Sequence, residues 1–251
     1  MYNLVKICLL LCIILVSCYI SSRQKNENFE SEPITLYVIT LKHENRLQNI
    51  NMQNMKIHRQ EIVMIDAVKG DELNIDALLS HKKIDTCFEK PDPKESKIKK
   101  RELGCYMSHL KTYKKIKEEN RAGYSIVFED DFDVANYYFI EKVQNIISLC
   151  KNVDFDIIFL GQVLSQNKGN PITENIYEMD KNELLLGTHG LLIRNSSIDR
   201  ILDKVDCKIN LPIDHKLASL GKSGELTILV IYPFIVHQKG ESTIQNVHIS
   251  N

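Results

Sequence analysis

The sequence contains no tryptophan, and glycine and proline are scarce, with 10 Gly and 6 Pro among 251 residues. This scarcity excludes collagen-like chains and chains dominated by linkers. Neither sign of charge is in excess, since 32 Lys and Arg oppose 33 Asp and Glu for a formal net charge of −1. That balance argues against nucleic acid as a partner. Apolar residues at 43% and charged residues at 26% are ordinary globular proportions, which exclude global disorder.

A long apolar run lies at the N-terminus, where residues 7–16 are unbroken apolar residues preceded by Lys6. A helix over residues 4–20 would be about 25 Å long, against a hydrocarbon core of about 30 Å. Residues 1–22 are therefore predicted to be an uncleaved membrane anchor or a cleaved signal peptide, with lipidation of Cys18 as a third interpretation. A stem (residues 23–33) follows. Residues 34–251 are expected to lie and act on the far side of a membrane, in a secretory lumen or a bacterial cell envelope.

Cysteine is spread thinly over the rest of the chain, at Cys87, Cys105, Cys150 and Cys207. No Cys-x-x-Cys spacing of the kind that binds metals is present among these four. One or two disulfides are permitted but not required. The sequence Asn195-Ser196-Ser197 matches a glycosylation sequon, which by itself is a weak signal.

The pattern after residue 33 predicts an α/β fold. Expected strands, apolar on both faces, are residues 34–41, 61–67, 124–128, 155–161 and 226–231, and expected helices are residues 103–119, 137–149 and 196–205. Strands of this kind alternating with helices favour a single Rossmann-like domain with a mixed, mainly parallel sheet. The basic stretch at residues 91–101 is expected to be a break between two blocks, either a solvated loop or a mobile loop that attracts an anionic substrate.

Four carboxylates follow the strand expected at residues 124–128, namely Glu129, Asp130, Asp131 and Asp133. Crowded carboxylates repel one another unless a cation neutralises them. Ligands of open α/β sheets bind outside the carboxyl ends of strands, and hard oxygen ligands suit Mg²⁺ or Mn²⁺ together with phosphates. These residues therefore indicate a divalent ion that holds a diphosphate. The alternative is a solvated acidic turn that caps the next helix.

Two motifs carry a resemblance to a known family, residues 103–110 (LGCYMSHL) and residues 125–131 (SIVFEDD). Shorter pieces agree in order: residues 37–46 (a strand leading to Arg46), residues 211–215 (LPIDH), and residues 232–244, with Tyr232-Pro233, Val236-His237-Gln238 and Ser242-Thr243-Ile244. Together they resemble glycosyltransferase family 25, which includes lipooligosaccharide galactosyltransferases and collagen hydroxylysine galactosyltransferases.

The resemblance implies a GT-A-like nucleotide-diphospho-sugar transferase fold and inverting transfer from a UDP-sugar, UDP-galactose first. The acceptor would be a hydroxyl of a glycan, a lipooligosaccharide or a protein-linked group. Carried over residue by residue, Asp131 would bind the metal, and Glu129 and Asp130 would complete the nucleotide motif. Arg46 and the end of the first strand, Thr40, would lie near the nucleotide. The chain departs from the family pattern at Thr40, where Asn is usual, and at Arg101, where Gly is usual.

Inversion is a single displacement and requires a group that takes the proton of the acceptor hydroxyl. We predict Asp214 as this base; a helix N-cap is the alternative role, and the two are compatible. His109 is predicted to support the donor site from a second layer, and Ser108 to tie its helix to a strand. His189 is a candidate donor contact, and His237 a candidate metal or phosphate ligand or a surface histidine. Because tryptophan is absent, any sugar-stacking surface must use Tyr, Phe or His.

Two competing functions remain at this point. Asp131-Phe132-Asp133-Val134 matches the Asp-x-Asp-Val motif of haloacid-dehalogenase-like phosphatases, with Asp131 as nucleophile. The motif lies near the middle of the chain rather than at the start of its domain. A catalytically weak, membrane-tethered glycan-binding relative is the other possibility, motivated by the departures at Thr40 and Arg101.

Overall fold

The computed structural model describes residues 32–163, 168–182 and 185–240. Residues Pro33–Asn251 form one compact unit. In the described part of the chain, no helix is both long and apolar enough to span a bilayer. The segment predicted as an anchor or signal, most of the stem, and Ser242-Thr243-Ile244 lie outside the described residues.

The elements follow the sequence pattern closely. The helices are α2 (Glu44–Lys56), α3 (Ile75–Ser80), α4 (Pro93–Glu119), α5 (Phe139–Leu149), α6 (Ile198–Val205) and α7 (Ile213–Ser223). The strands are β1 (Ile34–Thr40), β2 (Ile62–Asp66), β3 (Tyr124–Glu129), β4 (Phe132–Val134), β5 (Ile157–Phe159), β6 (Pro171–Thr173), β7 (Ile176–Glu178), β8 (Gly190–Arg194), β9 (Ile228–Ile231) and β10 (Val236–Gln238). Three short 3₁₀ turns complete the regular structure of the described residues.

The described strands build an eight-stranded sheet in the order β2-β1-β3-β8-β5-β9-β7-β6, with β4 and β10 paired separately. The pairings make β1, β2, β3, β5, β6 and β9 point the same way, while β7 and β8 run against them. The expected α/β fold with a mixed, mainly parallel sheet is confirmed. The carboxyl ends of β1, β3, β5 and β9 therefore lie along one edge of the sheet.

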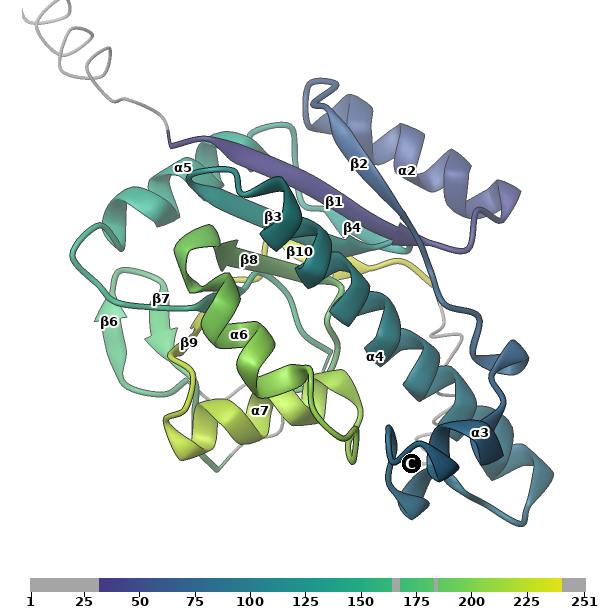
Figure 1. The fold of residues 1–251 in the computed structure, drawn as a ribbon. Coiled ribbons are helices and arrows are strands. Elements are labelled where there is room, and N and C mark those ends of the chain that lie inside the picture. The colour runs from purple at the N-terminus through teal and green to yellow at the C-terminus, as the bar shows by residue number, and fades with distance from the viewer. Residues whose placement is uncertain (1–31, 164–167, 183–184, 241–251) are drawn as a thin grey trace, which may run out of the picture. The chain divides into compact units, whose positions relative to one another are not determined.

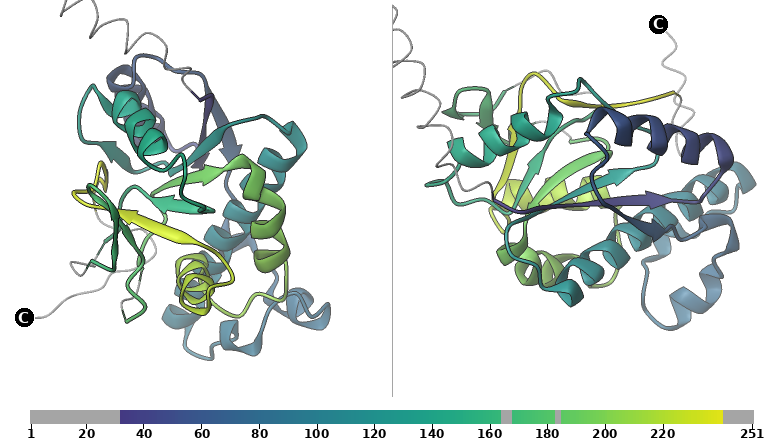
Figure 2. Two further views of the ribbon diagram at one scale, coloured as in Figure 1. Left: turned by 90° about the vertical axis from the view of Figure 1, so that its left-hand side faces the viewer. Right: turned by 90° about the horizontal axis from the view of Figure 1, so that it is seen from above.

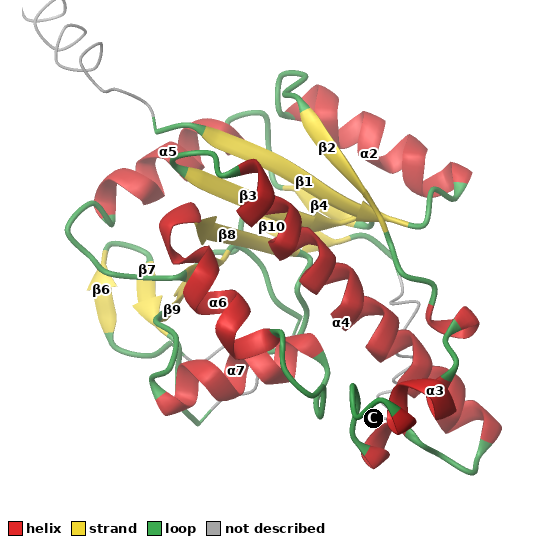
Figure 3. Cartoon of the chain, viewed as in Figure 1, coloured by secondary structure: helices red, strands yellow, loops and turns green. Residues whose placement is uncertain are grey.

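Helices cover both faces of this sheet, which makes three layers (Figures 1 and 2). Helices α4, α6 and α7 lie on one face, and α2 and α5 lie on the other together with the β4–β10 pair (Figure 3). Alternate residues of each central strand face the two layers: in β1, Tyr37 and Ile39 join the core under α4, and Leu36 and Val38 join the core under α2. Burial on both faces explains the nearly unbroken apolar runs.

The basic stretch at residues 91–101 does not form the expected loop, because α4 begins at Pro93. Asp92 is its N-cap, and its carboxylate accepts hydrogen bonds from the backbone N–H groups of Lys94 and Glu95, both at 2.9 Å. Proline at the first helical position and a capping aspartate before it are strong helix starts. The start of this helix was not predicted from the sequence, because the lysines leave the first turns of α4 without an apolar stripe.

Two side expectations are also settled by the fold. Asn195 is 8% exposed, and its amide donates to the backbone carbonyls of Arg121 and Ala122 while accepting from Ser125. A glycan cannot be attached there without breaking this network, so the sequon is not a surface acceptor site. The four described cysteines are all free thiols, so none of the permitted disulfides forms among them.

The glycine and serine of residues 103–110 bring α4 against the chain that follows β2. An added Cβ at Gly104 would lie 2.7 Å from the backbone N of Gly70 and 2.7 Å from the carbonyl oxygen of Val68. The Ser108 hydroxyl accepts a hydrogen bond from the backbone N–H of Val68 at 2.8 Å. Ser108 thus ties α4 to the segment that follows β2, two residues beyond the end of the strand, rather than to a strand itself. The glycine is needed because two backbones meet there.

Gly104→Ala is expected to lower the free energy of unfolding by about 1–3 kcal/mol, because the new methyl group meets backbone rather than a flexible side chain. In an ordinary helix interior the same change would stabilise by about 0.5–1 kcal/mol. Gly221→Ala in α7 is the matched control, since its Cβ would meet side-chain ends of Met179 and Ile228 and no backbone atom among its three nearest neighbours. Urea unfolding measures both. A Gly104→Ala protein as stable as the wild type contradicts the close backbone contact.

Candidate functional site

The acidic turn between β3 and β4 lies at the carboxyl edge of the sheet and is held from both sides. From α2, the buried Asn49 amide donates to the backbone carbonyls of Asp130 at 3.1 Å and Phe132 at 2.9 Å. From the segment after β10, the backbone N–H of Lys239 donates to the Asp131 carbonyl at 2.7 Å. The turn is thus fixed by side-chain and backbone bonds, which place its carboxylates before any ligand arrives.

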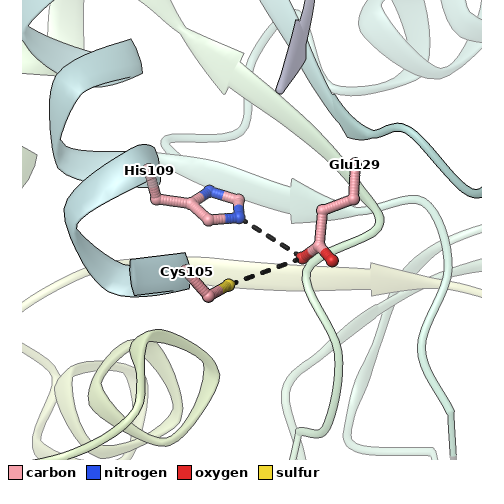
Figure 4. A group of neighbouring side chains, drawn as sticks. All are labelled: Cys105, His109 and Glu129. Atoms are coloured by element: carbon pink, nitrogen blue, oxygen red, sulfur yellow. Dashed lines mark hydrogen bonds and ion pairs between the residues drawn. The ribbon is translucent and has the colours of Figure 1, made fainter. Parts of the chain in front are cut away.

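Glu129, the last residue of β3, is gripped by side chains from two other elements. Its Oε1 accepts a 2.6 Å hydrogen bond from the Thr188 hydroxyl and lies 3.4 Å from His109 Nε2 and 4.0 Å from Cys105 Sγ. Figure 4 shows Cys105 and His109, one turn apart on α4, both directed at this carboxylate. Burial raises the pKa of Glu129, but the bonds from His109 and Thr188 outweigh it and leave the pKa below its usual value. Glu129 is therefore a fixed anion.

Asp130 and Asp131 share a guanidinium. Arg46, from the first turn of α2, places Nε 3.6 Å from Asp130 Oδ1 and Nη1 3.2 Å from Asp131 Oδ2. Asp131 is only 5% exposed, and its Oδ2 also accepts from the Gln238 amide at 3.0 Å. Burial and the nearby Glu129 charge raise the pKa of Asp131 to about 6, although Gln238 and Arg46 oppose them.

The other carboxylate oxygen of Asp131, Oδ1, has surroundings that suit a cation ligand. Oδ1 is buried, and no hydrogen-bond donor of the described residues reaches it. An unpartnered buried carboxylate oxygen is costly unless a ligand satisfies it. Oxygen is the ligand type that Mg²⁺ and Mn²⁺ prefer, so the site fits such an ion at this atom.

A second group of ligand atoms gathers behind the turn, where Cys105, His109 and Glu129 offer atoms within 4.8 Å of one another. A sulfur–nitrogen–oxygen set suits zinc better than Mg²⁺ or Mn²⁺. Burial, and then the charge of Glu129, raise the pKa of the Cys105 thiol well above its usual value, so it stays protonated. The Glu129 oxygen of this group already accepts a hydrogen bond from Thr188 and lies 3.4 Å from His109 Nε2, whereas no described residue donates to Asp131 Oδ1.

Two further predicted residues meet at the loop before β8: His189, which the loop carries, and Asp214, which accepts a hydrogen bond from it. Asp214, in the first turn of α7, accepts a hydrogen bond from the backbone N–H of Gly187 at 3.0 Å and one from His215 N at 2.8 Å. The N-cap of α7 is Pro212, so the alternative role of Asp214 as the N-cap is wrong. His189 is 2% exposed, and neither ring nitrogen is within hydrogen-bond geometry of a partner among the residues that the structure describes. Burial lowers the pKa of His189, which favours the neutral ring.

The remaining predicted residues lie at the margins of the site. Thr40 is 1% exposed, and its hydroxyl accepts from the backbone N–H of Lys42 at 2.9 Å, so it shapes the turn after β1. His109 has no exposed surface and acts on the site only through Glu129. His237 is exposed on β10, next to Gln238.

Sequence reasoning missed four residues that hold the site together, which are Asn49, Cys105, Thr188 and Gln238. Cys105 stood within a motif that was recognised, so its spacing of four from His109 was a usable signal. Gln238 stood in one of the shorter pieces of the resemblance, but no role was predicted for it. No local pattern showed the contacts of Asn49, Thr188 and Gln238, because each reaches the acidic turn across more than 50 residues of sequence.

Comparison with known proteins agrees with this geometry. The profile of glycosyltransferase family 25 (LPS biosynthesis protein) matches residues 34–217, which span the acidic turn, the motif on α4 and Asp214. The chain belongs to glycosyltransferase family 25. It is also 28% identical over 191 residues to procollagen galactosyltransferase 1-A of Xenopus laevis. That similarity covers 72% of this chain and 30% of the relative, so the chain spans about a third of the protein it matches.

The structure shows what the residues of the family 25 motif on α4 do. The Gly-Cys-x-x-Ser-His block packs α4 on the chain after β2 and directs Cys105 and His109 at Glu129. The phosphatase interpretation is wrong, both because the family match covers the motif on which it rested and because of the position of Asp133. That carboxylate is paired with Lys56 at 2.6 Å, on the α2 side of the turn.

The raised pKa of Asp131 predicts a pH dependence of stability. Its pKa is about 6 in the folded protein and near 3.8 when unfolded. The folded state therefore keeps a proton that the unfolded chain has lost, and this contribution is full below about pH 4 and disappears as the pH rises through 6. Between pH 4.5 and 7.5, in EDTA, the wild type is expected to lose about 2 kcal/mol more than Asp131→Asn does. Urea unfolding at both pH values measures the difference. Parallel losses contradict the buried, titrating carboxyl.

Proposed function

We propose that this protein transfers a hexose, galactose first among the candidates, from a UDP-sugar to a hydroxyl of a glycan, lipooligosaccharide or protein-linked acceptor, with inversion at the anomeric carbon. Family membership supports glycosyl transfer as the class of reaction. The observation that carries the donor assignment is Asp131, whose buried Oδ1 at the carboxyl edge of the sheet meets no hydrogen-bond donor of the described residues. Such an edge is where α/β sheets bind nucleotides.

The donor diphosphate is proposed to lie at the Arg46 end of the site. A divalent cation, Mn²⁺ or Mg²⁺, bound to Asp131 would neutralise charge on the departing diphosphate. Arg46 bridges Asp130 and Asp131 and thereby offers a second positive group at the same place. Glu129 is held by Thr188 and His109, so it fixes the position of the turn and does not move with the ligand.

Asp214 is the proposed base. It lies in the first turn of α7 and is half-buried, and its carboxylate reaches the loop that carries Thr188 and His189. A carboxylate so placed can accept the proton of an acceptor hydroxyl as the bond to the sugar forms. Its bond to Gly187 also fixes the loop, so the base and the loop are positioned together.

The predicted membrane association rests on the N-terminal sequence, which lies outside the described residues, and it stays a prediction. Location in a secretory lumen or a cell envelope also stays a prediction.

A donor panel with the full chain tests the proposed reaction. UDP release is measured from UDP-galactose, UDP-glucose and UDP-N-acetylglucosamine, with Mn²⁺, Mg²⁺ or EDTA, with and without lactose as acceptor. Turnover of one UDP-sugar that EDTA abolishes and Mn²⁺ restores is the expected result. Binding of UDP-sugar without release of UDP would instead favour a glycan-binding relative that has lost catalysis. Turnover unaffected by EDTA would overturn the metal assignment.

A further inference from the structure

A cluster of aromatic side chains lies on the same sheet edge as the acidic turn and has no part in the chemistry assigned above. Tyr232 directly follows β9, and Phe234 follows it by two residues, while Tyr177 comes from β7. The ring centroids of Tyr232 and Phe234 are 4.9 Å apart, and those of Tyr177 and Tyr232 are 5.7 Å apart. These three residues are here called the aromatic cluster.

Contacts connect the aromatic cluster step by step to the proposed base. The Gln162 amide, after β5, donates to the Tyr232 hydroxyl at 2.9 Å. The next residue, Val163, donates its backbone N–H to the Leu186 carbonyl at 2.8 Å. An added Cβ at Gly187 would lie 2.9 Å from the Val163 side chain, and Gly187 is the residue that Asp214 holds. The cluster therefore adjoins the Asp214 side of the site.

The cluster is partly exposed, unlike the apolar core on which Tyr232 and Phe234 pack. Tyr177, Tyr232 and Phe234 are each half-buried, and Val163 beside them is 52% exposed. Phe159 at the end of β5, by contrast, has no exposed surface. Exposed apolar surface next to a reacting site is more often a binding surface than an accident of packing.

Polar groups accompany the rings. The ammonium of exposed Lys168 lies 4.9 Å from the ring centroid of Tyr177 and 5.7 Å from that of Tyr232. It also lies 3.4 Å from the Tyr177 hydroxyl. Rings with a few hydrogen-bonding groups at their margin suit a pyranose, which offers an apolar C–H face and hydroxyls around its rim.

The two ends of the site distinguish donor from acceptor. Arg46, from α2 directly after β1, and Oδ1 of Asp131 suit a diphosphate. The aromatic cluster comes from β7 and the segment after β9, is linked to Asp214 through Val163 and Gly187, and consists of neutral rings. A base must stand next to the hydroxyl that it deprotonates. A sugar bound on the aromatic cluster, which adjoins the Asp214 side of the site, is therefore the acceptor.

We propose that Tyr177, Tyr232 and Phe234, with Lys168 at their margin and the buried Gln162 holding the Tyr232 hydroxyl, form an acceptor subsite that stacks a neutral pyranose ring next to Asp214. The proposal rests on the proposed glycosyl transfer for the role of the bound sugar, and on the cluster alone for the binding of the sugar.

Sugar binding is tested without any donor, by saturation-transfer difference NMR on the full chain with methyl β-galactoside, methyl β-glucoside and lactose as probes. Protein aromatic protons are saturated, and the sugar C–H signals are observed. At least one pyranoside is expected to receive saturation from the wild type, and Phe234→Leu and Tyr177→Leu are expected to reduce that signal about fivefold or more. Leucine keeps apolar volume and removes the ring. Tyr138→Leu, at an aromatic residue that is 68% exposed at the start of α5, is the matched control.

Thermal unfolding shows which variants fold. If Phe234→Leu does not, Tyr177→Leu alone decides, because its ring lies on a peripheral strand. A wild type that transfers saturation to none of the three sugars overturns the proposal, as does an unchanged signal in the folded variants.

Kinetics separate this proposal from the proposed function. If the enzyme turns over UDP-galactose, Phe234→Leu is expected to raise the KM for the acceptor about tenfold, equivalent to about 1.4 kcal/mol, and to leave the KM for UDP-galactose within twofold. Equal rises in both KM values overturn the acceptor assignment. Sugar binding that needs the cluster in a protein that turns over no UDP-sugar refutes the proposed function and leaves the sugar site standing.

Discussion

Asp131→Asn is expected to reduce cation-dependent turnover of the UDP-sugar by about 10²–10³-fold while the protein stays folded. Asparagine keeps an oxygen that can accept the hydrogen bond from Gln238, although the ion pair with Arg46 is lost. It removes the negative charge from the buried oxygen that no described residue reaches, and the proposed divalent cation would lose that ligand. Initial rates of UDP release against Mn²⁺ concentration measure the effect, and the Mn²⁺ requirement is expected to move to higher concentration.

Asp133→Asn is the matched control for this prediction. Asp133 is two residues along the same turn, but its carboxylate is paired with Lys56 on the α2 side. Its replacement is expected to change turnover less than threefold, with a modest loss of stability from the broken ion pair. If both variants lose activity equally, the effect belongs to the total charge of the turn rather than to a cation at Asp131.

Asp214→Asn is expected to lower kcat by about 10²–10⁴-fold and to leave the KM for the UDP-sugar nearly unchanged, because the group that takes the acceptor proton is lost. The asparagine oxygen can still accept the hydrogen bond from Gly187, so the loop that carries Thr188 stays in place. A steady-state comparison of kcat and KM with the wild type measures the split.

Asp214→Ala separates the chemical role from the structural one. Alanine removes both the base and the acceptor for Gly187, so it is expected to raise the KM for the UDP-sugar in addition to lowering kcat. An Asp214→Asn enzyme with wild-type kcat shows that Asp214 only positions the loop, and the base must then be sought elsewhere at this edge.

Local pattern was sufficient for the fold because the strands are buried on both faces. Residues 124–128 are apolar without interruption, and such a run belongs in the middle of a sheet covered by helices. The carboxylates that follow it had to lie at the carboxyl edge. The start of α4 was missed although Asp92 and Pro93 mark it, because the lysines that follow lack an apolar periodicity.

Contacts between distant segments decided how the site works. The resemblance gave the metal to Asp131 and the nucleotide motif to Glu129, two positions earlier, without a physical reason for the difference. The tertiary structure supplies one, since Thr188 and His109 satisfy Glu129, while no donor of the described residues reaches one buried oxygen of Asp131. Likewise Asn195 matched a sequon, and only its burial showed that the amide is committed to the backbone.

The amino-acid sequence by itself determined the α/β fold, the acidic turn after β3 and the family, because each is written in the periodicity or the spacing of nearby residues. Only the tertiary structure decided that Asp131 is the acid with an open oxygen, that Asp214 holds the Gly187 loop, and that Tyr177, Tyr232 and Phe234 form one surface. The physical reason is that burial and the supply of hydrogen-bond donors depend on segments that meet across the fold, and no local pattern records which segments meet.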